Sequence, residues 1–186
     1  MKDIYRGDLV RLTVESPETM AKAFLRWNSD TECHRLSDSE PAQLWSEKKI
    51  REFIEKNLDG EPKDFRFAVR SLAEDKLIGF VGIVPSWVQG DAWAMIVIGE
   101  RDHWDKGYGT DAMRLIVQYG FIEANLRRIS LGVHSYNPRA FRAYEKVGFK
   151  MEGRIREEGL RDGRRYDGLY MGVLREEWLA KQAGAV

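Results

Sequence analysis

The fold of this chain is decided by the stretch His103-Trp104-Asp105-Lys106-Gly107-Tyr108-Gly109-Thr110-Asp111-Ala112. Its glycines allow the backbone to turn so that consecutive N–H groups point the same way. The helix that we expect to follow adds unpaired N–H groups and the positive end of its dipole. Lys106 adds a full positive charge. The stretch therefore predicts either a pocket for a phosphate or diphosphate, or a plain glycine-rich turn capped by Thr110.

Two common phosphate-binding motifs do not fit this stretch. Gly107-x-Gly109-x-x-Ala112 matches the dinucleotide fingerprint, but that fingerprint directly follows a strand, and here a polar segment intervenes. The next predicted strand also ends at His134, where an acidic residue would be needed for the ribose. The mononucleotide P-loop needs a lysine after its glycine, whereas Lys106 precedes Gly107. We therefore reject both motifs. A dinucleotide-binding redox protein stays a third possibility, which fails if CoA but not NAD shifts the thermal stability of the protein.

The second half of the chain alternates helix and strand signals. They predict a helix over 109–124, a strand over 129–134, a helix over about 138–147, and strands over 149–160 and 164–174. Asn137-Pro138 opens the second of these helices, and Gly148 stands where a left-handed cap would end it. Asp162-Gly163 is a strong signal for a two-residue hairpin turn.

The first half of the chain gives a different pattern. It predicts a strand over 9–14, helices over 17–28 and 43–58, and strands over 65–71, 77–84 and 92–99. Ser16-Pro17 is typical of a helix start, and Asp59-Gly60 of a helix end. A loop is expected between the two helices. The short connections at 73–75 and 90–91 favour antiparallel hairpins.

The resulting order is β-α-α-β-β-β-α-β-α-β-β. It predicts an α/β fold with a mixed, mainly antiparallel twisted sheet flanked by helices, rather than a doubly wound parallel sheet or a barrel. A length of 186 residues is expected for one domain, residues 1–186, with a sizeable core.

Composition excludes several classes of protein. The 30 basic and 30 acidic side chains cancel, which removes the overall attraction that non-specific nucleic-acid binders use. Cys33 is the one cysteine, so neither an internal disulfide nor a cysteine-based zinc site is expected, and we expect no metal. The start lacks the apolar core of a secretory signal, and the longest apolar stretch, 77–88, is too short to span a bilayer. We expect a cytoplasmic protein without nucleic-acid or membrane partners.

A second motif, Asn-Pro-x-Ala-x-x-x-Tyr-x-Lys-x-Gly-Phe, occupies residues 137–149. Together with 104–112 and Leu126-Arg127-Arg128-Ile129, it resembles the GNAT superfamily of acyl-CoA N-acyltransferases. Within that superfamily the chain resembles the Rim-type branch, named for the N-terminal acetylation of ribosomal proteins. The order of strands and helices also matches the fold of that family from end to end.

The resemblance implies that acetyl-CoA is the co-substrate. Backbone N–H groups from Asp105 through Thr110 would hold its pyrophosphate. The strand at 96–98 would pair with the pantetheine arm and offer an N–H to the thioester carbonyl, and Asn137 would fix that arm. The cofactor-binding residues implied in this way are Ile96, Val97, Ile98, Trp104, Asp105, Lys106, Gly107, Tyr108, Gly109, Thr110, Asn137, Arg139, Arg142 and Lys146.

Tyr144 is the general acid that the resemblance implies, and it would protonate the departing thiolate of CoA. The same tyrosine shares a helix face with Phe141 and Val147, so a plain core tyrosine is the alternative. Capping of the helix alone would likewise explain Asn137.

The chain departs from the family at two positions. Trp104 stands where the family often has Arg or Gln, and Trp93 stands where many relatives have a Glu that serves as base. Nearby groups that could replace this base are Glu100, which we put first, and Asp91, Asp102 and His103. Removal of the proton by water stays open.

These observations predict an N-acetyltransferase that uses direct attack in a ternary complex. Cys33 is far from the reacting segments in the sequence, so no acyl-enzyme intermediate is expected. The acceptor is an amine of a protein N-terminus, an amino acid, a polyamine or an antibiotic, and a homodimer stays open. The alternative, motivated by Trp93, is a catalytically silent CoA-binding module or sensor.

Overall fold

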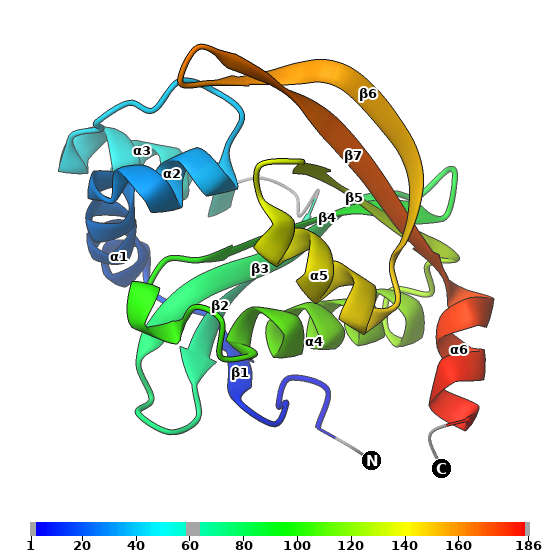
Figure 1. The fold of residues 1–186 in the computed structure, drawn as a ribbon. Helices are drawn as coiled ribbons and strands as arrows, with labels where there is room; N and C mark the ends of the chain where they lie inside the picture. The colour runs from blue at the N-terminus through cyan, green and yellow to red at the C-terminus, as the bar shows by residue number, and fades with distance from the viewer. Residues whose placement is uncertain (1–2, 59–63, 185–186) are drawn as a thin grey trace.

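The computed structural model describes residues 3–58 and 64–184 and contains one seven-stranded sheet, with the strand order β1-β2-β3-β4-β5-β7-β6 (Figure 1). The strands are β1 (Val10–Thr13), β2 (Phe65–Ser71), β3 (Leu77–Ser86), β4 (Asp91–Ile98), β5 (Arg128–His134), β6 (Lys150–Arg161) and β7 (Arg164–Leu174). Among these strands, β4 and β5 pair in parallel and the other neighbours pair antiparallel. The predicted mixed, mainly antiparallel α/β sheet is confirmed.

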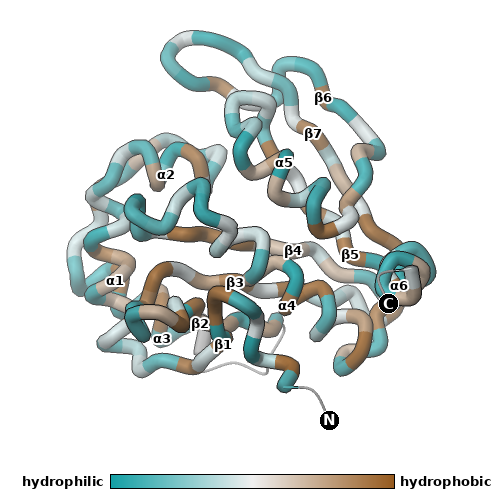
Figure 2. The backbone as a smooth tube through the Cα atoms, turned by 60° about the horizontal axis from the view of Figure 1, so that its bottom comes forward, coloured by the Kyte–Doolittle hydropathy of each residue, from teal (hydrophilic) through white to brown (hydrophobic). Residues whose placement is uncertain are grey.

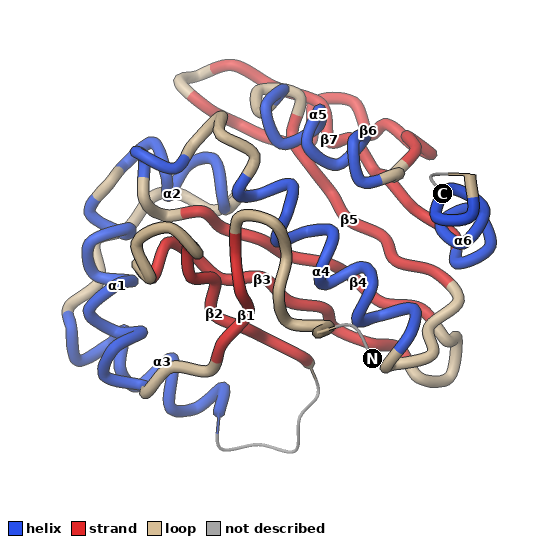
Figure 3. The backbone as a smooth tube through the Cα atoms, turned by 90° about the horizontal axis from the view of Figure 1, so that it is seen from below, coloured by secondary structure: helices blue, strands red, loops and turns tan. Residues whose placement is uncertain are grey.

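Helices cover both faces of the sheet. They are α1 (Pro17–Ser29), α2 (Thr31–Ser37), α3 (Glu47–Leu58), α4 (Tyr108–Ile122), α5 (Pro138–Val147) and α6 (Arg175–Ala183), with a short 3-10 turn at Arg101–His103. Helices α1, α2 and α3 lie together on one side, whereas α4 runs across the sheet (Figure 3). Within the described residues, no helix combines the length and apolar character needed to cross a bilayer.

Two apolar layers result from the alternation of side chains along the strands. On one face, Met113 and Ile116 of α4 pack with Val81, Ile83 and other residues of the main core. On the opposite face, Trp27 of α1 packs in a separate cluster. Figure 2 shows that the hydrophobic segments run along the central strands β3 and β4, while β6 is mainly hydrophilic.

The capping signals in the sequence act as expected. The side chain of Ser16 accepts a hydrogen bond from the Thr19 N–H at the start of α1. Asn137 does the same for Ala140 at the start of α5, which ends at Gly148 with a φ of 120°. Asp162 and Gly163 have φ values of 51° and 70°, as a tight turn between the two long strands β6 and β7 requires.

Three features differ from the sequence prediction. Helix α2 lies where a loop was expected, because Asp30 accepts hydrogen bonds from the N–H groups of Glu32 and Cys33 and starts a short helix. Helix α6 follows β7 and was not predicted. Helix α3 begins at Glu47 rather than at residue 43. The expected stop signal Asp59-Gly60 lies outside the described residues.

The strands β4 and β5 part after a short paired region. Their pairing covers Asp91–Trp93 and Arg128–Ser130, and the rest of β4 runs away from β5. The opening lies between α2 on one side and α5 on the other, because both helices contribute residues to the cavity described below. This parting determines where a ligand can reach the middle of the sheet.

Asp111 anchors the N-terminal segment to α4, and its removal should weaken the fold. Its carboxylate is 4% exposed and accepts hydrogen bonds from the N–H groups of Leu9 (2.8 Å) and Val10 (3.1 Å). We expect Asp111→Ala to lower the free energy of unfolding by about 2–4 kcal/mol, since two donors lose their partner. Urea denaturation measures this change. Asp8→Ala, at an exposed carboxylate nearby, is the control, and equal midpoints for the two variants would contradict the prediction.

Candidate active site

A cavity of about 210 Å³ lies at the opening between β4 and β5. Its wall combines the end of β4, the turn before α4, one side of α5 and part of α2. The predicted site residues on this wall are Ile96, Val97, Ile98, Trp104, Asp105, Gly107, Gly109, Thr110, Asn137, Arg139, Arg142, Tyr144 and Lys146. The structure therefore brings the two sequence motifs together, although they lie on separate helices.

The turn before α4 has the conformation that an anion site requires. Asp105 and Gly107 both have positive φ values, 57° and 92°, directly before the helix begins. No side chain in the described part of the chain caps α4. Capping of the turn by Thr110 is therefore not observed, and the diphosphate pocket stays a prediction. The first N–H groups of α4 belong to residues of the cavity wall, Gly109 and Thr110, where helix geometry leaves them available to a ligand.

Trp104 connects β4, the turn and α5. Its indole N–H donates a hydrogen bond to the backbone carbonyl of Ile98, with an N···O distance of 2.6 Å. The guanidinium of Arg139 stacks on the indole ring, 3.8 Å from its centroid. A cation at this distance from an indole is attracted by the ring. Trp104 thus places a positive charge from α5 beside the turn, near the position where the family often has a cation of its own.

Asn137 uses its side chain to join α5 to α2. Its Oδ1 accepts from the Ala140 N–H at 3.1 Å, and its Nδ2 donates to the carbonyl of Leu36 at 3.3 Å. The side chain is buried, with 9% of the residue exposed. Capping is therefore observed, and the predicted contact with a pantetheine arm stays a prediction.

Tyr144 is half-buried on the cavity wall, and its ring packs against Phe149 at a centroid distance of 6.1 Å. Burial raises the pKa of Tyr144 to about 12. The phenol therefore keeps its proton at neutral pH. In this state it can donate a hydrogen bond but cannot act as a base.

Glu100 lies outside this cavity wall and is held by other side chains. Its Oε1 accepts hydrogen bonds from Trp27 Nε1 at 2.9 Å and from Arg26 at 3.0 Å. Lys76 Nζ lies 2.9 Å from Oε2. Burial alone would raise the pKa of this carboxyl, but its hydrogen bonds outweigh burial and lower the pKa. The contacts favour a structural role, and the assignment of Glu100 as base stays a prediction.

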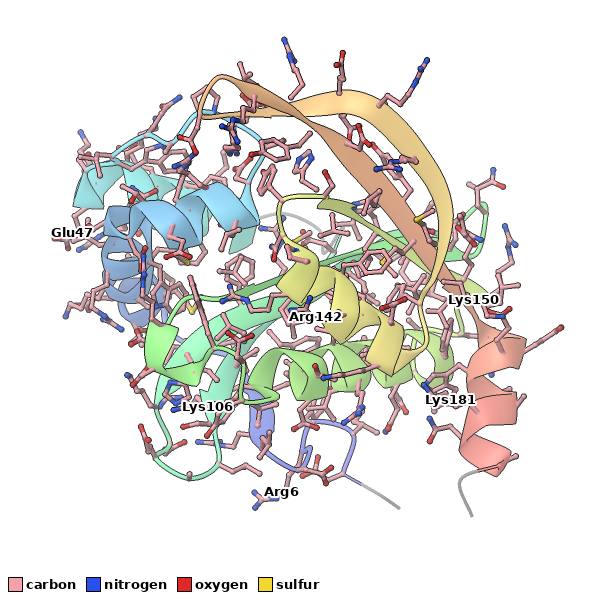
Figure 4. The ribbon with its side chains drawn as sticks, in the orientation of Figure 1. Arg6, Glu47, Lys106, Arg142, Lys150 and Lys181 are labelled. Carbon is pink, nitrogen blue, oxygen red and sulfur yellow. The ribbon has the colours of Figure 1, made fainter. Side chains whose placement is uncertain are left out.

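Two other predicted residues have side chains away from the cavity wall. The ring of Tyr108 packs on His103 at a centroid distance of 4.8 Å. Lys106 lies on the outer edge of the turn, whereas Arg142 lies on α5 (Figure 4). The predicted contribution of residues 106 and 108 through their backbone N–H groups does not depend on these side chains.

The cavity wall also contains residues that the sequence did not indicate. These are Cys33, Leu36, Ser37, Ala140 and Ala143, whereas His103, which also lies on the wall, was one of the groups considered as a base. The expectation that Cys33 is far from the reacting segments is wrong in space, because α2 brings it to the wall. Its side chain is 3% exposed, and burial raises the pKa of its thiol to about 11. The sequence signal that could have indicated these α2 residues is Asp30 as a helix N-cap, followed by Cys33, Leu36 and Ser37 at the spacing of one helix face.

Metal binding has no support in the side-chain geometry. Among the described residues, no group of three or more His, Cys, Asp or Glu side chains is arranged to hold a metal ion.

The family model "Acetyltransferase (GNAT) domain" matches residues 11–150. The chain belongs to the GNAT acetyltransferase family. The chain is 27% identical over 134 residues to the SPbeta prophage-derived uncharacterized N-acetyltransferase YokL of Bacillus subtilis, covering 72% of this chain and 73% of YokL. It is 33% identical over 115 residues to a spermidine N(1)-acetyltransferase of Vibrio cholerae, covering 61% of this chain and 65% of that enzyme.

Solved structures agree with the fold. A chimera of the spermidine N-acetyltransferase SpeG from Vibrio cholerae and hSSAT superposes with a TM-score of 0.78 at 25% identity, covering 92% of this chain and 99% of the chimera. A GNAT-family acetyltransferase from Bacillus anthracis superposes with a TM-score of 0.76 at 22% identity, covering 92% of this chain and 98% of that protein. The predicted enzyme class, an acetyl-CoA-dependent N-acetyltransferase, is confirmed, because the relatives are named N-acetyltransferases.

The α2 wall of the cavity should lose stability in acid through Asp30. A hydrogen bond from Arg101 and the N–H groups of α2 lower the pKa of Asp30 to about 2. A lowered pKa contributes stability that is present above about pH 4 and is lost as the pH falls toward 2. We expect Asp30→Asn to be about 1–2 kcal/mol less stable at pH 7 and to lose less stability between pH 4 and pH 2. Urea unfolding at several pH values tests this, with Asp8→Asn as control; parallel pH profiles for Asp30→Asn and the parent protein would contradict it.

Proposed function

We propose that this chain transfers the acetyl group of acetyl-CoA to a primary amine by direct attack in a ternary complex. The observation that carries the proposal is the single cavity in which the glycine turn, the unpaired end of β4 and the phenol of Tyr144 meet. We also propose that residues 1–186 form one acetyltransferase domain, which acts in the cytoplasm and needs no metal.

Binding of acetyl-CoA uses the backbone first. The N–H groups of residues 105–110 hold the diphosphate, and Arg139 adds a positive charge beside them. Residues 96–98 of β4, which have no partner strand on the β5 side, offer backbone N–H and C=O groups to the amides of the pantetheine arm. Asn137 borders the arm, and Arg142 and Lys146 lie toward the nucleotide end.

The acetyl transfer has three chemical requirements. The acceptor amine must be neutral to attack, and an alkyl amine with a pKa near ~10.4 must first lose a proton. The tetrahedral oxyanion needs a fixed donor, often worth about 3–4 kcal/mol, and a β4 backbone N–H supplies it. The thiolate then leaves. Because thiols titrate near ~8.5, below the pKa of Tyr144, the phenol assists mainly by a hydrogen bond to the developing thiolate.

Direct attack is supported by the state of Cys33. The thiolate is the nucleophilic form of cysteine. Since burial raises the pKa of Cys33 to about 11, the thiolate is scarce at neutral pH. An acyl-enzyme route through this residue is therefore disfavoured, even though Cys33 borders the cavity.

The acceptor is proposed as an alkyl primary amine. The similarity to a spermidine N(1)-acetyltransferase supports this class. The Rim-type resemblance supports a protein N-terminus instead, and that acceptor is the second candidate. A screen of acetyl-CoA with spermidine, amino acids, aminoglycosides and short peptides, monitored by thiol release, separates them.

A catalytically silent CoA-binding module is the other candidate function. Two observations favour it: Trp93 stands where many relatives have a base, and Glu100 is fully engaged with its neighbours. Tight binding of acetyl-CoA without amine-dependent thiol release in the screen would support the silent module and overturn the enzyme.

Tyr144→Phe tests the role of the phenol. Loss of a hydrogen bond to a charged leaving group costs about 1.5–3 kcal/mol, so we expect kcat to fall roughly tenfold to a hundredfold. The Kd of acetyl-CoA, measured by calorimetry, should stay unchanged because the ring remains. Tyr119→Phe, on α4 and outside the cavity wall, is the matched control. A kcat for Tyr144→Phe equal to that of the control would remove Tyr144 from the mechanism.

A further inference from the structure

The opening between β4 and β5 can be reached from both faces of the sheet. On the face covered by α4 and α5, the core includes Ala92 and Ala94 of β4 and Leu131 and Val133 of β5. Because side chains alternate along a strand, Trp93 and residue 132 point to the opposite face. In the binding mode proposed above, acetyl-CoA runs along the turn before α4 and along α5, so we expect the amine to approach from the other face.

An aromatic–carboxylate patch, formed by Trp93, Tyr170 and Glu158, lies on that other face. The rings of Trp93 and Tyr170 are 5.9 Å apart, and Trp93 is 45% exposed. The hydroxyl of Tyr170 donates a hydrogen bond to Glu158 Oε1 at 2.5 Å. Gly132 lies between the two rings and places no side chain there: a Cβ on it would be 3.5 Å from Trp93 and 3.8 Å from Tyr170. Trp93 thus keeps an exposed surface beside Tyr170.

The local backbone directs Glu158 onto the patch. The pairing of β6 with β7 shifts register between Ile155 and Gly159, and Glu157 adopts a φ of 57°. This irregularity turns Glu158 over β7. Its carboxylate occupies the space above Gly168, where a Cβ would come within 1.5 Å of Oε2. Any larger residue at position 168 would displace the carboxylate.

Glu158 is available to a ligand, unlike Glu100. No lysine, arginine or histidine within residues 3–58 and 64–184 forms an ion pair with Glu158, and its Oε2 has no hydrogen-bond donor among them. The residue is also exposed. A carboxylate with one free oxygen beside two aromatic faces is suited to an alkylammonium ion, which pairs with the charge and lies against the rings.

The position of the carboxylate decides which ammonium group it takes. The reacting amine must lie at the opening between β4 and β5, beside Trp93. Glu158 lies over β7, the strand beyond β5, and neighbouring strands are about 4.8 Å apart. The carboxylate is therefore displaced from the opening by at least one strand. This separation fits two nitrogen atoms joined by a short hydrocarbon spacer.

We propose that the patch Trp93, Tyr170 and Glu158 binds the second, non-reacting ammonium group of a diamine or polyamine acceptor. Glu158 neutralises that charge, and the two rings cover the hydrocarbon spacer that leads to the reacting amine. This inference rests on the proposed acetyltransferase activity. It assigns acceptor selectivity to Trp93, Glu158 and Tyr170, which are not part of the cavity wall proposed for acetyl-CoA.

Glu158→Gln tests the proposal, because glutamine keeps the shape and can still accept from Tyr170. Steady-state kinetics are measured with 1,4-diaminobutane, spermidine and butylamine, which lacks the second charge. We expect the KM for both charged acceptors to rise about five- to tenfold, while the KM for butylamine and for acetyl-CoA stays within twofold. Glu157→Gln, the neighbouring exposed carboxylate, should behave as the parent protein.

Gly168→Ala provides a second, independent variant. Its methyl group displaces the Glu158 carboxylate and should reproduce the selective rise in KM. Gly153→Ala is its control, since a Cβ there meets only Tyr170 Cβ at an ordinary 3.9 Å.

These experiments distinguish failure of the patch assignment from failure of the proposed acetyltransferase activity. If the parent protein acetylates amines but Glu158→Gln leaves the KM of the diamines unchanged, or raises that of butylamine equally, the patch assignment is overturned. Acetylation of butylamine or peptides without acetylation of diamines overturns it as well. If no amine is acetylated, the proposed function itself fails, and the patch assignment falls with it.

Discussion

The site depends on one feature of the sheet: β4 and β5 do not pair beyond Trp93 and Ser130. From that point β4 has no strand partner on the β5 side, and those backbone groups of residues 96–98 that bond neither to β3 nor to Trp104 face the opening. Buried backbone groups without partners are costly. A ligand with amide groups of its own satisfies them, and the cavity lies where such a ligand would run.

The walls of the cavity are held by contacts between segments that are distant in the sequence. Asn137 joins α5 to α2 through the Leu36 carbonyl, and Trp104 carries the guanidinium of Arg139. Arg161, at the tip of the β6–β7 hairpin, donates to the carbonyls of the loop 38–40 that follows α2. The hairpin reaches over the molecule toward α2 (Figure 1). The opening is therefore framed by hydrogen bonds rather than by apolar packing alone.

Local signals predicted the parts of the fold that depend on local physics. Caps such as Ser16 and the turn Asp162-Gly163 are properties of short segments, and the structure matches them. Helix α2 was not predicted, because its seven residues are too few to show the periodic apolar pattern of a helix. Cys33 on the cavity wall and the engaged state of Glu100 follow from tertiary contacts. The position of Glu158 follows from a register shift in β6 that no sequence pattern indicated.

In the proposed complex, the turn at residues 105–110 holds a diphosphate through its backbone N–H groups while the thioester lies beside Tyr144. A crystal structure of the protein with coenzyme A tests it most directly. We expect diphosphate oxygens within hydrogen-bond distance of the Gly107, Gly109 and Thr110 nitrogens and the sulfur next to the Tyr144 hydroxyl. Coenzyme A bound elsewhere, with the turn empty or the Tyr144 ring turned away from the sulfur, would contradict it.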